Sequence, residues 1–411
     1  MSISRRRASI TLEARDSNHS LTLGKLMKQI PVAIIVSSVL ISGGGGTASA
    51  QSEMSYIGDK ASFALFAEKF AKADWPLPET ISFFDPAGTG APVIRYAHWV
   101  PTKGAAKGTV VHFNGRTEFI ERNIYSYKDL LDRGYEGRAL DWRGQGLSER
   151  QIDSKQRHSI DSFDTYVADA TFFIDDVIKL KSAGGTKVLL AHSMGGQIAL
   201  RYLLSDSGRN TFDYAVLSSP LLRVPGDRWY VRAGNFLKTS LGMGDWCVLE
   251  KPETWASDFK GNSCGLVSAK SAAESNLVDA ADAGKYTHAW QKLADSNCLI
   301  ESSRDARGVA SPDLRLACPT SDWLRAAFAS TDLVMETFSK LVTPTLIVRA
   351  MPDAAVDNDG QTEFCKLAKI ACIDVEAEEG TRAGHELLIE VEPIRRRFFR
   401  EFDGFVKVKK G

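Results

Sequence analysis

The hexapeptide A-H-S-M-G-G at residues 191–196 places a serine, Ser193, among small residues. The apolar run K-V-L-L precedes this hexapeptide and the helix-like stretch Q-I-A-L-R-Y-L-L follows it. A serine in a tight strand-to-helix turn is held exposed at a sheet edge. The residues two before and two after it must be small, because the chain folds back there. Ala191 and Gly195 occupy these positions, with alanine in place of the more usual glycine. We predict a nucleophile elbow with Ser193 at its tip; the alternative is a glycine-rich helix start without chemistry.

A serine hydroxyl is a weak nucleophile until a base accepts its proton, so the chain must also supply a histidine and an acid that orients it. Of the seven histidines, His385 in A-G-H-E-L-L follows the last expected strand, which fits the chain order of serine, acid and histidine. His192 adjoins Ser193 but is expected to point away from it. The turn M-P-D-A-A-V-D-N offers Asp353 and Asp357. We favour Asp353 because it comes first out of its strand, although either aspartate could simply shape the turn.

A tetrahedral intermediate at this serine would need backbone N–H donors aimed at its oxyanion. One donor is expected from Met194, the residue after the nucleophile. The other is expected from the loop Asn114-Gly115-Arg116 after the run V-V-H-F, with Arg116 as the preferred donor. The alternative is an ordinary strand-to-helix turn, with Asn114 and Arg116 in structural roles.

From about residue 80 onward the sequence alternates short β-branched runs with helical stretches, which predicts a mostly parallel sheet covered by helices on both faces. Apolar residues at helical spacing predict a helix over Phe163–Leu180, and Glu392–Val406 is expected to form a closing amphipathic helix. With 44% hydrophobic and 25% charged residues, the composition is that of a globular protein with a substantial core. Eight runs are expected to form the strands: Ile81–Phe84, Val93–Val100, Thr109–Phe113, Gly137–Asp141, Lys187–His192, Tyr214–Ser218, Thr345–Arg349 and Cys372–Glu376.

The interval 221–342 breaks this alternation, because it has no comparable strand and is rich in helix formers and tryptophan. We predict a helical cap here, inserted after the sixth strand, between a first core part at 81–220 and a second at 343–411. Connections from the carboxyl ends of parallel strands lie over the ligand site, so the cap is expected to cover it.

The N-terminal part of the chain has the pattern of an export signal. A twelve-residue, largely apolar run at Ile30–Ile41 follows two lysines and precedes a glycine string and T-A-S-A-Q. Twelve residues span about 18 Å as a helix against a hydrocarbon core of about 30 Å, so a stable membrane span is the weaker interpretation. We predict a signal peptide at 1–50 cleaved after Ala50, an N-terminal extension at 51–80, and export to the periplasm or beyond. The alternatives are an inner-membrane anchor that keeps its signal and a translation start at Met27.

Export changes how the six cysteines are interpreted, since disulfides persist outside the cytosol. Cys365 and Cys372, seven positions apart, are placed for a local bridge. Disulfides are expected to staple the cap, with the pairing left open; buried thiols are the alternative. No cluster of cysteine and histidine suggests a metal, and no cofactor is expected. The remaining four cysteines fall within the expected cap: Cys247, Cys264, Cys298 and Cys318.

The charge distribution disfavours nucleic acid as a partner. Without residues 1–50 the chain keeps 45 basic side chains against 49 acidic ones, so it has no long-range attraction for phosphate backbones. The expected partner is a small molecule. Arg395–Arg397, with Lys407, Lys409 and Lys410, could also make transient contact with an anionic membrane surface, although a solvated helix face and tail is the favoured interpretation.

Together with the elbow, five segments resemble the α/β-hydrolases of the lysophospholipase and monoacylglycerol lipase branch, often labelled serine aminopeptidase-like. They are F-N-G-R-T-E-F-I-E-R at 113–122, L-D-W-R-G-Q-G-L-S-E-R at 140–150, S-S-P-L-L at 218–222, C-P-T-S-D-W-L-R-A-A at 318–327 and G-H-E-L-L-I-E at 384–390. The resemblance implies an α/β-hydrolase fold and a serine hydrolase that cleaves carboxylic esters of lysophospholipids or monoacylglycerols through an acyl-enzyme. The family commonly has His-Gly where this chain has Asn114-Gly115. The D-W-R-G-Q-G-L-S string is assigned a structural turn and no catalytic part.

Two alternatives stay open. The same scaffold serves aminopeptidases of the proline iminopeptidase type, in which cap carboxylates such as Asp227, Asp245 or Glu250 would grip the substrate's amino group. The other alternative is a catalytically inactive binding module, which an intact serine, acid and histidine disfavour. A dehalogenase would need a carboxylate where Ser193 stands.

Overall fold

The computed structural model describes residues 76–88, 92–152, 157–248, 316, 318–375, 383–390 and 392–408. The predicted signal peptide, most of the N-terminal extension and the middle of the predicted cap, with Cys264 and Cys298, lie outside these residues. The positions of Lys409 and Lys410 also lie outside them.

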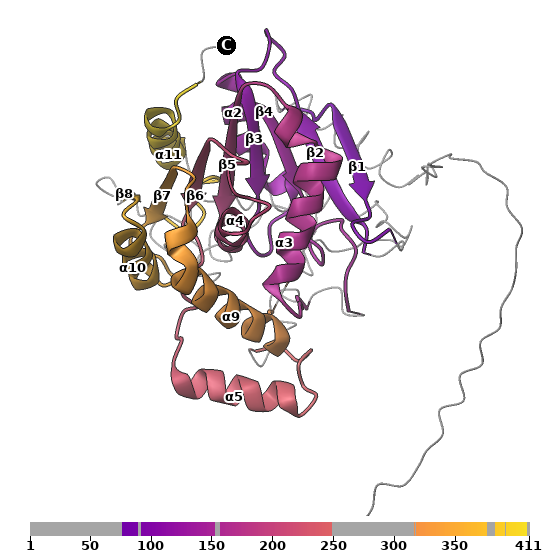
Figure 1. Ribbon diagram of the computed structural model, residues 1–411, viewed down its shortest axis with the longest axis vertical. Helices are drawn as coiled ribbons and strands as arrows, with labels where there is room; N and C mark the ends of the chain where they lie inside the picture. The colour runs from indigo at the N-terminus through magenta and orange to yellow at the C-terminus, as the bar shows by residue number, and fades with distance from the viewer. Residues whose placement is uncertain are drawn as a thin grey trace, which may run out of the picture. The chain divides into compact units, whose positions relative to one another are not determined.

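The described chain forms one eight-stranded sheet with the order β1-β2-β4-β3-β5-β6-β7-β8 (Figure 1). β2 pairs antiparallel with both β1 and β4, and every other neighbouring pair is parallel. The mostly parallel sheet predicted from the sequence is therefore confirmed, with strand ends that differ by at most one residue. The strands are β1 Thr80–Phe84, β2 Ile94–Trp99, β3 Gly108–Phe113, β4 Glu136–Leu140, β5 Thr186–His192, β6 Tyr214–Ser218, β7 Thr345–Ala350 and β8 Ala371–Val375.

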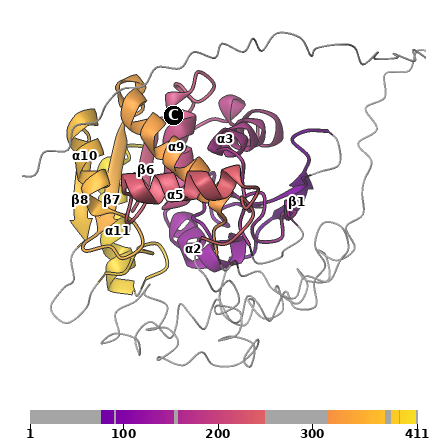
Figure 2. The same ribbon diagram turned by 90° about the horizontal axis from the view of Figure 1, so that it is seen from below.

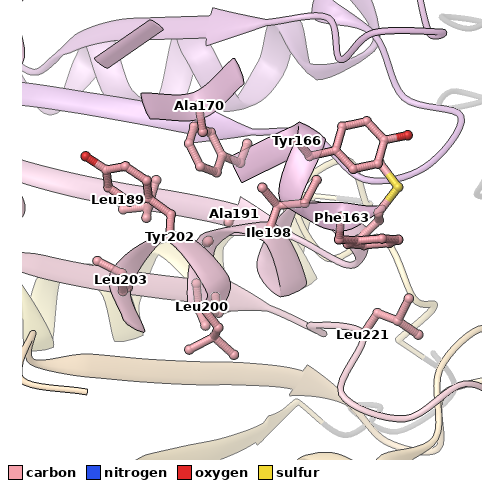
Figure 3. Close-up of a cluster of buried hydrophobic side chains, with 14 of the residues drawn as sticks. Phe163, Tyr166, Ala170, Leu189, Ala191, Ile198, Leu200, Tyr202, Leu203 and Leu221 are labelled. Atoms are coloured by element: carbon pink, nitrogen blue, oxygen red, sulfur yellow. The ribbon is translucent and has the colours of Figure 1, made fainter. Parts of the chain in front are cut away.

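Helices cover both faces of the sheet. Successive side chains of a strand point to opposite sides, and the apolar ones on each side pack against helices. On one side, Leu189 and Ala191 of β5 pack in a cluster with α3 and α4, shown in Figure 3. On the other side, Val188 and Leu190 pack with α2 and α11. The α-helices are α2 Ile124–Asp132, α3 Phe163–Phe172, α4 Met194–Leu204, α5 Trp229–Ser240, α9 Ser321–Thr337, α10 Asn358–Ala368 and α11 Glu392–Phe405, and short 3-10 turns form at Ile120–Asn123, Leu180–Ser182 and Phe338–Lys340.

The helix predicted over Phe163–Leu180 is not continuous. α3 ends at Phe172 and a π-turn follows at Phe173–Val177, in which the N–H of Ile178 donates to the carbonyl of Phe173. Lys179 then takes a left-handed conformation with φ 48°. Apolar spacing predicts which residues are buried, but it does not detect the change of hydrogen-bond register that ends the α-helix.

The described parts of the interval 221–342 contain helices and contribute no strand to the sheet. α9 packs on the core through Trp323 and Ala327, whereas α5 packs against α9, across which it lies in Figure 2. Arg232 of α5 pairs with Asp332 of α9. That this interval covers the active site stays a prediction.

Two disulfides are present among the described cysteines. Cys365 pairs with Cys372, as their spacing suggested, and joins α10 to β8. Cys247 pairs with Cys318, which ties the segment after α5 to the segment before α9.

Candidate active site

Ser193 lies at the turn between β5 and α4 and adopts φ 50° and ψ −118°. Such a conformation costs a residue with a side chain about 1–3 kcal/mol, so the surroundings must impose it. The N–H of Ser193 donates to the carbonyl of Ser218 at 3.0 Å. The carbonyl of Ser193 accepts from the N–H groups of Gln197 at 3.1 Å and Leu221 at 3.0 Å. These three hydrogen bonds hold the partly exposed Ser193 at the carboxyl end of β5.

The small residues around Ser193 are needed for close approach. A methyl group on Gly195 would lie 2.1 Å from the carbonyl oxygen of Phe113. Ala191 is fully buried in the core behind the turn. The strand-to-helix elbow predicted from the sequence therefore has the backbone geometry that its composition suggested.

His385 and Asp353 come from the loops that follow β8 and β7. Nδ1 of His385 lies 2.7 Å from Oδ2 of Asp353, and both side chains are buried. The other carboxylate oxygen accepts from the N–H groups of Ala355 at 2.8 Å and Val356 at 3.2 Å. Asp357, the alternative acid, instead caps the N-terminus of α10. The geometry thus joins Asp353 to the histidine.

The electrostatics of Asp353 favour its ionised form. Burial alone would raise the pKa of this carboxyl, but the hydrogen bond and charge of His385 and the two backbone N–H groups lower it overall. An ionised Asp353 accepts the Nδ1 proton of His385, which leaves Nε2 as the basic nitrogen.

The elbow and the loop that carries His385 are in contact. The rings of His192 and His385 have centroids 4.7 Å apart, and Nε2 of His192 lies 3.2 Å from the His385 carbonyl oxygen. No hydrogen bond joins the Ser193 hydroxyl to His385 within the described residues. Catalytic hydrogen bonds often shorten only when substrate is in place.

The oxyanion loop, residues 114–117, passes directly beside the serine. A methyl group on Gly115 would lie 3.2 Å from Cβ of Ser193. The N–H of Gly115 is already donated to Glu118 at 2.5 Å, so it does not point at a substrate. Met194 is the first residue of α4. Met194 and Arg116 as oxyanion donors stay predictions.

Side chains of the oxyanion loop have structural contacts. The amide of Asn114 donates to the carbonyl of Leu140 at 3.0 Å. The guanidinium of Arg116 lies 5.9 Å from the ring centroid of Trp323, and burial lowers its pKa to about 10. The Asn-Gly pair that stands in place of His-Gly therefore braces the loop against β4.

The D-W-R-G-Q-G-L-S string holds the oxyanion loop from behind. Nε2 of Gln145 donates to the carbonyl of Gly115 at 3.1 Å, and its Oε1 accepts from the N–H of Thr117 at 2.9 Å. The carboxylate of Asp141 accepts from the N–H groups of Ile120 at 2.8 Å and Leu147 at 3.0 Å. The string is a structural turn, and it also clamps the backbone beside Ser193.

Sequence reasoning missed Glu118 altogether and gave His192 no role. Both side chains are buried: Glu118 accepts the N–H of Gly115, and Nε2 of His192 lies 3.2 Å from the carbonyl oxygen of His385. The one hint of such a pair in the sequence was the glutamate of F-N-G-R-T-E. A buried carboxylate needs a partner, but no local pattern identifies which residue it is.

The carboxylates proposed for the aminopeptidase alternative are bound to arginines. Asp227 lies 2.7 Å from Arg232, and Asp245 lies 3.2 Å from Arg157. The hydrogen bond to Arg232 lowers the pKa of Asp227. Glu250 lies outside the described residues.

The basic stretch of α11 is also paired with acidic side chains. Arg395 lies 2.6 Å from Asp129, Arg397 lies 3.0 Å from Glu401, and Arg396 pairs with Glu392. Because these arginines are paired with carboxylates, they offer less positive charge to an anionic membrane surface.

Across the described ranges, no helix has both the length and the apolar character that crossing a bilayer takes. The same ranges hold no group of three or more histidine, cysteine, aspartate and glutamate side chains arranged to bind a metal ion.

A mostly parallel sheet of this order, with a serine elbow after its fifth strand, defines an α/β-hydrolase. The model of the family "Serine aminopeptidase, S33" matches residues 104–392, which is more than half of the chain. The protein belongs to this family, and the resemblance inferred from its motifs is confirmed.

Similar proteins carry the names lysophospholipase and monoglyceride lipase. The probable lysophospholipase L2 of Haemophilus influenzae is 26% identical over 321 residues, which cover 77% of this chain and 89% of that protein. Lysophospholipase L2 of Escherichia coli is 26% identical over 298 residues, which cover 70% of this chain and 76% of that protein. A soluble variant of monoglyceride lipase from Saccharomyces cerevisiae shares the fold with a TM-score of 0.53 at 16% identity, covering 80% of this chain and 94% of that one.

Proposed function

We propose that this protein is a serine hydrolase that cleaves carboxylic esters of lysophospholipids or monoacylglycerols through an acyl-enzyme. The hydrogen bond between His385 and Asp353, on loops adjoining the Ser193 elbow, is the observation that carries the proposal. The lysophospholipases and the monoglyceride lipase among its relatives support the substrate class.

In the proposed mechanism, His385 accepts the proton of the Ser193 hydroxyl through Nε2 while the oxygen attacks the ester carbonyl. Asp353 holds the Nδ1 proton and stabilises the imidazolium that forms. The N–H groups of Met194 and Arg116 donate to the developing oxyanion. His385 then protonates the departing alcohol, and water cleaves the acyl-enzyme by the same steps in reverse order.

The test is a substrate panel run with wild type and Ser193→Ala. We expect wild type to release fatty acid from lysophosphatidylcholine or monoacylglycerol, and Ser193→Ala to lose this activity with an unchanged circular dichroism spectrum. A fluorophosphonate probe should add its mass at Ser193. Wild type that fails to label, or a Ser193→Ala variant that retains activity, would show that this serine is not the nucleophile.

The aminopeptidase alternative is an outcome of the same panel. Turnover of aminoacyl amides without turnover of acyl esters would favour it. The pairing of Asp227 and Asp245 with arginines speaks against it, because neither carboxylate then offers its full charge to a substrate amine. Export and transient membrane contact stay predictions.

A further inference from the structure

We propose that Glu118 and His192 form a buried ion pair that positions the oxyanion loop and the loop of His385 relative to the serine elbow. The two side chains would act as positioning residues for the hydrolysis proposed above, on which this inference rests.

A continuous series of contacts supports this role. Oε2 of Glu118 accepts the N–H of Gly115 at 2.5 Å, and Oε1 lies 3.2 Å from Nδ1 of His192. Nε2 of His192 lies 3.2 Å from the carbonyl oxygen of His385. The side chains of Glu118 and His192 are both only 2% exposed. The contacts therefore run from the backbone beside Ser193 to the backbone of the proposed base without passing through solvent.

The groups beside His192 favour its charged form. Nε2 faces the carbonyl oxygen of His385, which can only accept a hydrogen bond, so this nitrogen carries a proton. Nδ1 lies 3.2 Å from the Glu118 carboxylate in ion-pair contact without the alignment of a hydrogen bond, and the negative charge of that carboxylate favours a proton on Nδ1 as well. Burial alone would lower the pKa of His192, but the charge of the Glu118 carboxylate raises it overall. Burial likewise would raise the pKa of Glu118, but His192, Arg122 and the Gly115 N–H lower it.

The other charged groups around the pair are balanced. Arg122 binds both carboxylate oxygens of Glu386, the residue after His385, at 2.5 Å. His112 faces Glu118 and His192, and burial lowers its pKa to about 4, so its ring is neutral. Asp353 pairs with Nδ1 of His385. A cationic His192 therefore meets one buried counter-ion, Glu118, and adds no net charge to the site.

The pair explains why two loops from distant parts of the sequence keep one geometry. The oxyanion loop follows β3, and the loop of His385 follows β8 at the far edge of the sheet. A displacement of about 1 Å between reacting groups can cost on the order of 100-fold in rate. A charged hydrogen bond at each end resists such a displacement better than a neutral one.

The test compares Glu118→Gln and His192→Gln with wild type, with kcat counted per site titrated by a fluorophosphonate. Glu118→Gln keeps an acceptor for Gly115 but removes the charge. We expect kcat per titrated site to fall about 10- to 100-fold, with KM within about twofold. We also expect weaker binding of a trifluoromethyl ketone, which mimics the tetrahedral intermediate. A merely structural role would lower the number of titrated sites and leave kcat per site unchanged.

Glu136→Gln is the matched control. Its carboxylate lies 3.1 Å from Nε2 of His98 at the amino end of β4, whereas Ser193 lies at the carboxyl end of β5, so this variant should lose stability and keep kcat per titrated site. Equal losses of kcat per site in Glu136→Gln and Glu118→Gln would overturn the proposal, as would unchanged kcat per site in Glu118→Gln.

A measurement on wild type keeps the proposal testable if a variant does not fold. Nitrogen-15 NMR of the histidine rings at pH 7 should show both nitrogens of His192 protonated, and a neutral His192 ring would refute the ion pair. If wild type itself showed no ester hydrolysis, the proposed function would be refuted instead. Failure of the ion-pair proposal and failure of the proposed function are therefore distinguishable.

Discussion

The backbone of Gly115 approaches the side chain of Ser193 so closely that a methyl group on Gly115 would be crowded. A methyl on Gly115 would lie 2.9 Å from Nδ1 of His192 and 3.2 Å from Oε2 of Glu118, as well as 3.2 Å from Cβ of Ser193. His192 and Glu118 are buried and paired with each other, so we expect the oxyanion loop to shift away from them. The chemistry proposed for Ser193 thus depends on a residue that has no side chain.

Gly115→Ala is expected to lower kcat about 100-fold at a stability cost of about 1–3 kcal/mol, because the oxyanion loop must shift away from the elbow. Steady-state kinetics and urea unfolding measure the two effects. Gly184→Ala is the matched control, since a methyl there meets no atom within 4 Å. Wild-type kinetics in Gly115→Ala would show that the close approach does not matter.

The buried ion pair predicts a pH dependence of stability. The pKa of His192 is raised in the folded state, so its contribution is fully present below the ordinary histidine value of about 6.5 and is lost as the pH rises through the raised value. The double variant Glu118→Gln/His192→Gln has neither titrating group. We expect the free energy of unfolding of wild type minus that of the double variant to decrease from pH 6 toward pH 9. A difference that stays constant or increases would contradict a cationic His192.

At the residue level, the sequence predicted those site residues that a local motif identifies. Ser193, the small residues around it and the preference for Asp353 followed from strand ends and turn residues. Glu118 and His192 did not, because their contacts join residues brought together by the sheet, and a single sequence holds no record of such pairing.

At the scale of elements, the alternation of β-branched runs with helical stretches predicted all eight strands. Most of these strands are buried on both faces, so each appears in the sequence as a short run of mostly apolar residues. The helix over 163–180 was predicted too long, since the π-turn keeps Phe173 and Ile174 buried while it changes the hydrogen bonds. The disulfide partner of Cys247 could not be predicted from the sequence. It is determined by the fold, which brings the segment after α5 next to the segment before α9.

The two described disulfides should differ in how much they stabilise the protein. Cys247–Cys318 spans 71 residues and Cys365–Cys372 spans seven. In the chain-entropy model this difference is worth about 2 kcal/mol in favour of the longer loop. Guanidinium unfolding of Cys247→Ala/Cys318→Ala and of Cys365→Ala/Cys372→Ala measures it. A larger loss in the second variant would contradict the expectation.

At the scale of the whole molecule, the sequence-based predictions of fold and family are confirmed, while the export signal concerns residues outside the described ranges. If it is cleaved as predicted, the mature protein begins at Gln51. Expression of the full chain in a bacterium with a periplasm, followed by intact-mass analysis, tests this. A mass that retains residues 1–50 on a membrane-associated protein would favour the uncleaved anchor.

β6 and β7 are neighbours in the sheet, although more than a hundred residues separate them in the chain. Their pairing fixes the strand ends next to Ser193 and Asp353 whatever length of chain connects them. α9 is anchored in the core, whereas α5, with Asn235 as its one buried residue, rests on α9. Mutations that accumulate on α5 would thus leave Ser193 and Asp353 in register. If the interval 221–342 covers the active site as predicted, evolution could change which substrates are accepted independently of how they are cleaved.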